Sequence, residues 1–171
     1  MLRVVVAVTL AAALLGTSMP AVETARVEHA DARVEGELAG LAATAERLLA
    51  RNDPSPPGVP GARRTVTLHA PGPSWASASL DTLSIPGSTT PGDDSTRVSW
   101  RTVGGRETTR TLSSPLVGHG DGLTIEGGGS RRLVLQVMRQ NGDPVVVVRR
   151  PEFKSDAGSS PGHEVAGDRT P

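Results

Sequence analysis

The sequence has no cysteine and no tyrosine, and its 171 residues include only two tryptophans and one phenylalanine. Without cysteine the chain forms no disulfide, thiolate zinc site or iron–sulfur cluster, and it has no cysteine nucleophile. Eighteen basic side chains balance eighteen acidic ones, so the basic excess and the stacking aromatics of nucleic-acid-binding modules are missing. We therefore expect no nucleic-acid partner. Twenty glycines and fourteen prolines leave room for one modest globular core.

Recognisable catalytic and metal-binding motifs are also missing. No two of the four histidines are spaced to share a helix face or a strand pair, although a metal site needs several converging ligands. His119 and Asp121 form a close pair among glycines, for which a turn is the simpler interpretation. The run from Gly127 to Ser130 is not followed by the Gly-Lys-Ser/Thr of a phosphate-binding loop. We expect a non-enzymatic protein with no catalytic residue, no cofactor and no metal.

An apolar run stands near the start of the chain. Val4 to Leu15 contains Thr9 as its single polar residue, and a less apolar extension continues to Pro20. A bilayer span takes about 20 apolar residues, whereas a secretory signal needs only about 7 to 15. Residues 1–19 are therefore predicted to be a transmembrane anchor or a signal segment.

The charge before this run predicts its orientation. Arg3 precedes the apolar residues, and basic flanks stay on the cytoplasmic side of a membrane. The chain after Pro20 is therefore expected outside the cell. The sequence predicts a single-pass membrane protein with an outer C-terminal domain, or a secreted protein if the segment is cleaved.

Residues 20–51 are predicted to form an amphipathic helix. Apolar residues recur at a mean spacing of 3.5, which is typical of one helix face, and charged residues fill the other positions. Asn52-Asp53-Pro54 supplies a stop, so the helix is expected to end near Arg51. We expect the stripe to pack on the sheet or on partner helices. The stripe consists of Val27, Ala30, Val34, Leu38, Leu41, Ala45 and Leu48.

A linker and a β domain follow. Four prolines and two glycines make residues 52–61 a semi-stiff spacer. Residues 62–150 show the alternation of strands, and we predict a small, mainly antiparallel sheet domain. Residues 151–171 are rich in Ser, Gly, Pro and charge and are predicted to be a disordered tail. The predicted fold is thus α+β, with a long apolar-then-amphipathic N-terminal helix before the sheet.

Two hairpins are predicted within the β domain. A primed turn at Gly104-Gly105 would pair Trp100 with Thr109. Asn141-Gly142 is a stronger signal, and it predicts a type I′ hairpin. In that hairpin Leu135 lies opposite Val148 and Val137 opposite Val146, which gives an apolar face, so we expect this pair of strands at the sheet centre.

The register of the second hairpin also predicts a basic patch. It gathers Arg131, Arg132, Arg149 and Arg150 at the open end of the hairpin. One interpretation is a surface for lipid headgroups or an acidic partner. The other is a set of solvated strand ends that discourage edge pairing, and the residues alone favour this second interpretation.

Several segments resemble a family of uncharacterised haloarchaeal proteins. The similarity extends over residues 1 to about 150, through the start MLRVVVAVTLAAALLGTSMPAVE, the strand GARRTVTL, Ser74-Trp75 and the run RRLVLQVMRQNGDPVVVVRR. The resemblance implies no established activity and no transferable functional residue. It implies a link to archaeal type IV pili or related secretion systems, and the architecture is similar to that of type IV pilins. The basic leader and the glutamate that pilins carry at their apolar segment are absent.

Together these features predict a non-enzymatic, membrane-anchored extracytoplasmic protein. Its expected partners are the membrane, through the N-terminal helix, and other pilin-like or secretion-system subunits, which would make it an accessory component of an archaeal type IV pilus. The alternative is a cleaved, secreted, β-rich binding module whose amphipathic helix covers its own sheet.

Overall fold

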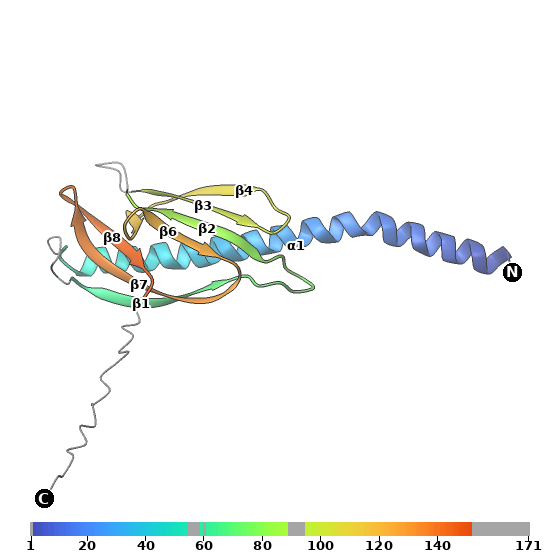
Figure 1. Cartoon of the computed structure of the whole chain (residues 1–171), viewed down its shortest axis with the longest axis horizontal. Coiled ribbons are helices and arrows are strands. Elements are labelled where there is room, and N and C mark those ends of the chain that lie inside the picture. The colour runs from blue at the N-terminus through green and yellow to red at the C-terminus, as the bar shows by residue number, and fades with distance from the viewer. Residues whose placement is uncertain (1, 55–58, 60, 89–94, 152–171) are drawn as a thin grey trace, which may run out of the picture.

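A computed structural model describes residues 2–54, 59, 61–88 and 95–151. One long helix runs through the molecule, and its C-terminal half lies along the strands while its N-terminal half extends beyond them (Figure 1). The fold is α+β. The elements are α1 (Leu2–Arg51), β1 (Arg63–Ala70), β2 (Leu80–Pro86), β3 (Thr96–Thr102), β4 (Glu107–Leu112), β5 (Leu116–Gly118), β6 (Gly122–Glu126), β7 (Gly129–Gln140) and β8 (Asp143–Arg149).

The first third of α1 differs from the long apolar helix that the sequence predicts. The helix is continuous through Pro20, but within the described part of the chain no helix combines the length and the apolarity needed to cross a membrane. The expected long apolar N-terminal helix is therefore wrong. Its apolar run, Val4 to Leu15, is shorter than the roughly 20 residues of a bilayer span. The predicted tail after Pro151 and half of the predicted linker 52–61 lie outside the described residues.

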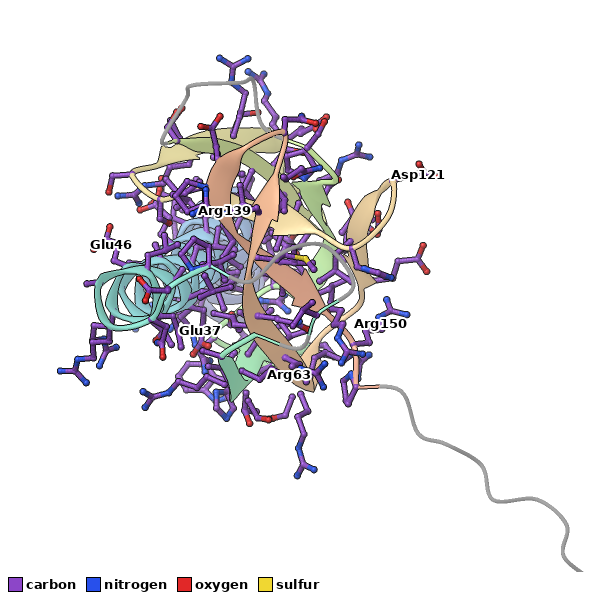
Figure 2. The ribbon with its side chains drawn as sticks, turned by 90° about the vertical axis from the view of Figure 1, so that its left-hand side faces the viewer. Glu37, Glu46, Arg63, Asp121, Arg139 and Arg150 are labelled. Carbon is purple, nitrogen blue, oxygen red and sulfur yellow. The ribbon has the colours of Figure 1, made fainter. Side chains whose placement is uncertain are left out.

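The strands form two sheets rather than the single sheet expected. One sheet has the order β1-β7-β8-β5 and the other β4-β3-β2-β6, and every pairing is antiparallel except that of β5 with β8. The edges β5 and β6 are joined by the short turn that contains Asp121, so the two sheets meet on that side (Figure 2). On the opposite side α1 lies between the two sheets and covers the gap between them.

The larger of two apolar clusters fills the space between the helix and the two sheets, and the smaller one consists of Val117, Val145 and Val147. Leu38 of α1, Trp100 of β3 and Leu135 of β7 belong to one buried cluster, and each is at most 1% exposed. The alternation of strand side chains places these residues inward. Because each sheet covers only part of the cluster, the helix supplies the remaining wall.

The β7–β8 hairpin has the register that its turn predicts. Asn141 (φ 54°) and Gly142 (φ 97°) both occupy the positive-φ region that a type I′ turn requires. Leu135 lies opposite Val148, Val137 lies opposite Val146, and the two strands occupy the centre of their sheet.

The β3–β4 hairpin differs from its prediction by one position. Trp100 lies opposite Thr108, and Thr109 lies opposite Ser99. The reason is that the connection between the two strands is longer than two residues. The N–H of Gly105 donates to the carbonyl of Thr102 at 2.9 Å, and the last paired residues before the turn are Arg101 and Glu107. Such a turn takes up an extra residue and shifts the register.

Candidate functional site

The apolar stripe of α1 faces the core. Six of its seven residues are buried, and Val27, the one nearest the N-terminus, is half-buried. The stripe therefore packs on the sheets of its own chain. Ala42 and Thr44, which the spacing did not single out, are buried as well.

Acidic side chains beside the stripe connect α1 to the first sheet's edge strand and to β3 and β4. On one side, Glu37 accepts the backbone N–H of His69 in β1 at 2.9 Å. On the other side, Asp31 Oδ1 accepts the indole Nε1–H of Trp100 at 3.2 Å and the hydroxyl of Thr102 at 3.2 Å. Figure 2, which looks along α1, shows Glu37 directed toward β1. The helix is thus fixed to both sheets by directional bonds as well as by apolar contact.

The N-terminal half of α1 contacts neither sheet over its described apolar residues. Val4, Val5, Val6, Val8 and Leu10 are between 58% and 66% exposed. Because near-consecutive helix positions point in different directions, these side chains surround the helix rather than form a stripe. The head therefore leaves these five apolar side chains uncovered.

Two loops enclose α1 where it leaves the head. In the first loop, residues 71–79, the carbonyl of Ser74 accepts Nη2–H of Arg26 at 2.8 Å, and the N–H of Ala78 donates to the carbonyl of Arg26 at 3.1 Å. In the second loop, residues 103–106, a Cβ on Gly105 would lie 3.0 Å from the side chain of Val27. Both loops therefore contact the same turn of the helix, and both lie at the end of the head from which α1 emerges (Figure 1).

These loops carry exposed apolar side chains of their own. Trp75 in the first loop is 90% exposed and Val103 in the second is 57% exposed. On the helix beside them, Met19 and Val22 are also exposed. We call these four residues the collar. The collar was not predicted from the sequence, because Trp75 was considered only within the resemblance to a family. The surrounding Pro, Gly and Ser do indicate an exposed loop.

The structure shows partners for two of the four arginines of the predicted basic patch. Arg131 Nη2 donates to the carbonyl of Glu126 at 3.5 Å, and Arg150 Nη2 donates to that of Thr124 at 2.6 Å. Both carbonyls belong to β6. Arg149 lines one hollow together with Arg150. Two of the four guanidinium groups thus bond the edge strand of the other sheet.

Several hollows lie on the surface of the head. One hollow, of about 490 Å³, lies over β2, β3 and β4 and is lined mainly by Ser and Thr, with Arg97 and Glu107. Another, about 320 Å³, is lined by His119, Thr124 and the arginines at the end of β8. The backbone N–H of His119 donates to the carbonyl of Val148 at 2.9 Å, so this residue lies in the expected turn. Across the described ranges no three His, Asp or Glu residues gather as a metal site would require.

A third hollow, of about 340 Å³, lies between α1 and the edge strand β1. Gly36 and Gly40 line it, and no heavy atom lies within 4 Å of the position a Cβ would take on either residue. Thr65 and Thr67 line its other side.

Comparison with known proteins places the chain in one family. Residues 1–151 match DUF7311, a domain of unknown function, and the chain belongs to this family. The match includes α1 together with both sheets and stops two residues after β8. No curated protein and no solved structure matches the chain.

Proposed function

We propose that this protein is a non-enzymatic extracytoplasmic protein attached to the cell envelope through the N-terminal half of α1. The observation that carries the proposal is the exposure of Val4, Val5, Val6, Val8 and Leu10 beyond the head. Full burial of one such side chain contributes about 1.5–3 kcal/mol. For five side chains with these exposures, burial in an apolar environment would stabilise the attached state by on the order of 5 kcal/mol.

The head acts in this proposal as a module that presents surfaces outside the cell. Its broad hollows are lined by Ser, Thr and Arg side chains, a composition suited to polar contacts with another macromolecule. The bonds from Asp31 and Glu37 to the sheets fix the head to the helix. A force or a displacement at the helix is therefore transmitted to the head.

The finer assignment is an accessory, pilin-like subunit of an archaeal type IV pilus or secretion system. It is supported by the sequence resemblance and by the arrangement of one continuous helix, Leu2–Arg51, with a β head on its C-terminal half. In such a subunit the exposed half of the helix packs against the helices of neighbouring subunits, and the heads face outward.

A cleaved, secreted binding module is the second candidate. It is favoured by the position of the core, whose first helical residue is Val34, with Ala30 buried nearby. Removal of residues up to about Val22 would leave the stripe, both sheets and the bonds of Asp31 in place. The head would then be complete without the protruding half of the helix.

Fractionation of the native protein, with its intact mass and N-terminal sequence, tests the proposal. Attachment predicts a start at Met1 or Leu2 and recovery with the envelope fraction, together with any subunits that bind it. A start near Met19 or Val22, with soluble protein in the medium, would contradict attachment and support the secreted module.

A further inference from the structure

The large exposed apolar side chains of the described residues gather at one end of the molecule. There are ten of them, seven on the N-terminal half of α1, and Trp75 and Val103 lie on the two loops beside the point where that half emerges. Only Val59 lies elsewhere. Monomeric proteins expose single apolar residues over the whole surface, so a concentration at one end indicates a contact surface.

The loops that carry these side chains are held in place. Bonds between Arg26 and the first loop, and the packing of Val27 beside Gly105 in the second, set both loops at the same level of α1. Met19 and Val22 are three residues apart, so they share a helix face just beyond that level. The collar therefore combines three segments of the chain around one axis.

The composition of the collar fits a particular environment. Tryptophan has an apolar ring and a polar N–H, and it is enriched where a bilayer meets water. The loop that carries Trp75 bonds Arg26, and Leu10 lies sixteen residues earlier, about 24 Å along the helix axis at 1.5 Å per residue. A headgroup boundary at the collar would place Leu10 and the apolar residues before it on the hydrocarbon side.

We propose that the collar is a contact surface for a lipid bilayer, in which Trp75 enters the boundary between headgroups and acyl chains. Val103, Met19 and Val22 lie at the same boundary and add apolar contact. A bilayer is favoured as the occupant because the three segments of the collar lie beside the helix at the end of the head from which the exposed residues Val4 to Leu10 extend, so one flat surface contacts all three segments. The inference rests on the proposed attachment through α1 and adds the surface that the head presents to the lipid.

Tryptophan fluorescence of the full chain tests the collar. The chain has two tryptophans, so Trp100→Phe leaves Trp75 as the single emitter. With phosphatidylcholine–phosphatidylglycerol vesicles we expect a blue shift, and stronger quenching by lipids brominated near the headgroup than by lipids brominated near the chain end. The control is Trp75→Phe, in which the remaining tryptophan, Trp100, is 1% exposed. We expect neither the shift nor the quenching in this variant. If Trp100→Phe does not fold, the difference between the native chain and Trp75→Phe gives the same signal.

Sedimentation with the same vesicles separates the possible failures. Trp75→Ala is expected to lower the vesicle partition coefficient about tenfold, whereas Val59→Ala leaves it unchanged. If the chain sediments with vesicles but Trp75 is neither shifted nor quenched, the collar inference is overturned and attachment through α1 stands. If the chain does not sediment, the collar inference is overturned too, and fractionation of the native protein decides attachment independently.

Discussion

The two halves of α1 have the same secondary structure and opposite surroundings. From Ala30 to Leu48 the apolar residues follow a stripe and are buried against two sheets. From Val4 to Leu10 they surround the helix and are exposed. The comparison shows that the head buries only the half whose apolar residues recur on one face. A stripe on one face needs one apolar neighbour, whereas apolar residues on several faces need several.

The polar contacts follow the same division. In the packed half, Asp31, Glu35 and Glu37 each bond a strand residue. In the protruding half, the hydroxyls of Thr9 and Thr24 each donate to a carbonyl of their own helix, four residues earlier. Hydroxyl bonds of this kind satisfy a polar group inside an apolar environment without a partner. The same bond occurs in the packed half, where the hydroxyl of Thr44 donates to the carbonyl of Gly40 at 2.9 Å, so the difference between the halves lies in the bonds to the strands.

The largest expected effect contrasts a core leucine with an exposed one. Leu38→Ala removes a side chain that is fully buried, and we expect it to lower the free energy of unfolding by about 2–5 kcal/mol. Leu10→Ala, the same change in the protruding half, is expected to stay within about 0.5 kcal/mol. Urea denaturation of both variants measures the difference. Equal losses would show that the protruding half also packs within the chain, which would break the comparison.

The next effect concerns the bond between the packed half and β3. Asp31→Ala leaves the indole N–H of the buried Trp100 without its acceptor, so we expect a loss of about 1–3 kcal/mol. Asp31→Asn keeps a carbonyl oxygen and should lose less. Glu28→Ala, an exposed acidic residue one turn earlier, is the matched control and should change stability little. The account fails here if Asp31→Ala and Glu28→Ala have equal unfolding midpoints.

A gain in stability is expected at a glycine in the packed half. Gly40→Ala meets no heavy atom within 4 Å and replaces a poor helix former, so the free energy of unfolding should rise by about 0.5–1 kcal/mol. Thermal denaturation checks this sign. A decrease would mean that the hollow between α1 and β1 closes in solution.

The smallest effect is expected for an exposed ion pair. Glu35 and Arg110 lie 3.0 Å apart, and both side chains are nearly half exposed. Water and salt screen such pairs, so Glu35→Gln should cost about 0.2–1 kcal/mol and less at high salt. Unfolding at two salt concentrations measures it. A larger loss of unfolding free energy that does not depend on salt would contradict this, and would mean that the pair contributes to stability as a buried contact does.

Local signals in the sequence predicted those parts of the fold that depend on near neighbours. The Asn141-Gly142 turn determines the register of its hairpin through two backbone angles, and the stripe from Ala30 to Leu48 determines the buried face of the helix. The offset at Trp100 arose because a Gly-Gly pair is compatible with several turns of different length. Leu123 and Ile125 alternate inward in β6, a pattern that was present in the sequence but short.

Contacts between distant segments were not predicted. The bond from Asp31 to Trp100 joins residues 69 positions apart, and no local pattern indicates it. The same holds for the division of the strands into two sheets and for the collar, whose two loops are joined by the N–H of Val103, which donates to the carbonyl of Ser79 at 2.8 Å. The arginine patch was predicted from a register that is correct, but that register does not indicate the bonds of Arg131 and Arg150 to β6 of the other sheet.

Hydrogen exchange along α1 tests the central claim most directly. It compares peptides from residues 4–22 with peptides from residues 30–48, in the isolated full chain and in the native envelope fraction. The account predicts that residues 30–48 are protected in both samples, and that residues 4–22 become protected only in the envelope. Equal protection of residues 4–22 in both samples would contradict attachment through the N-terminal half of α1.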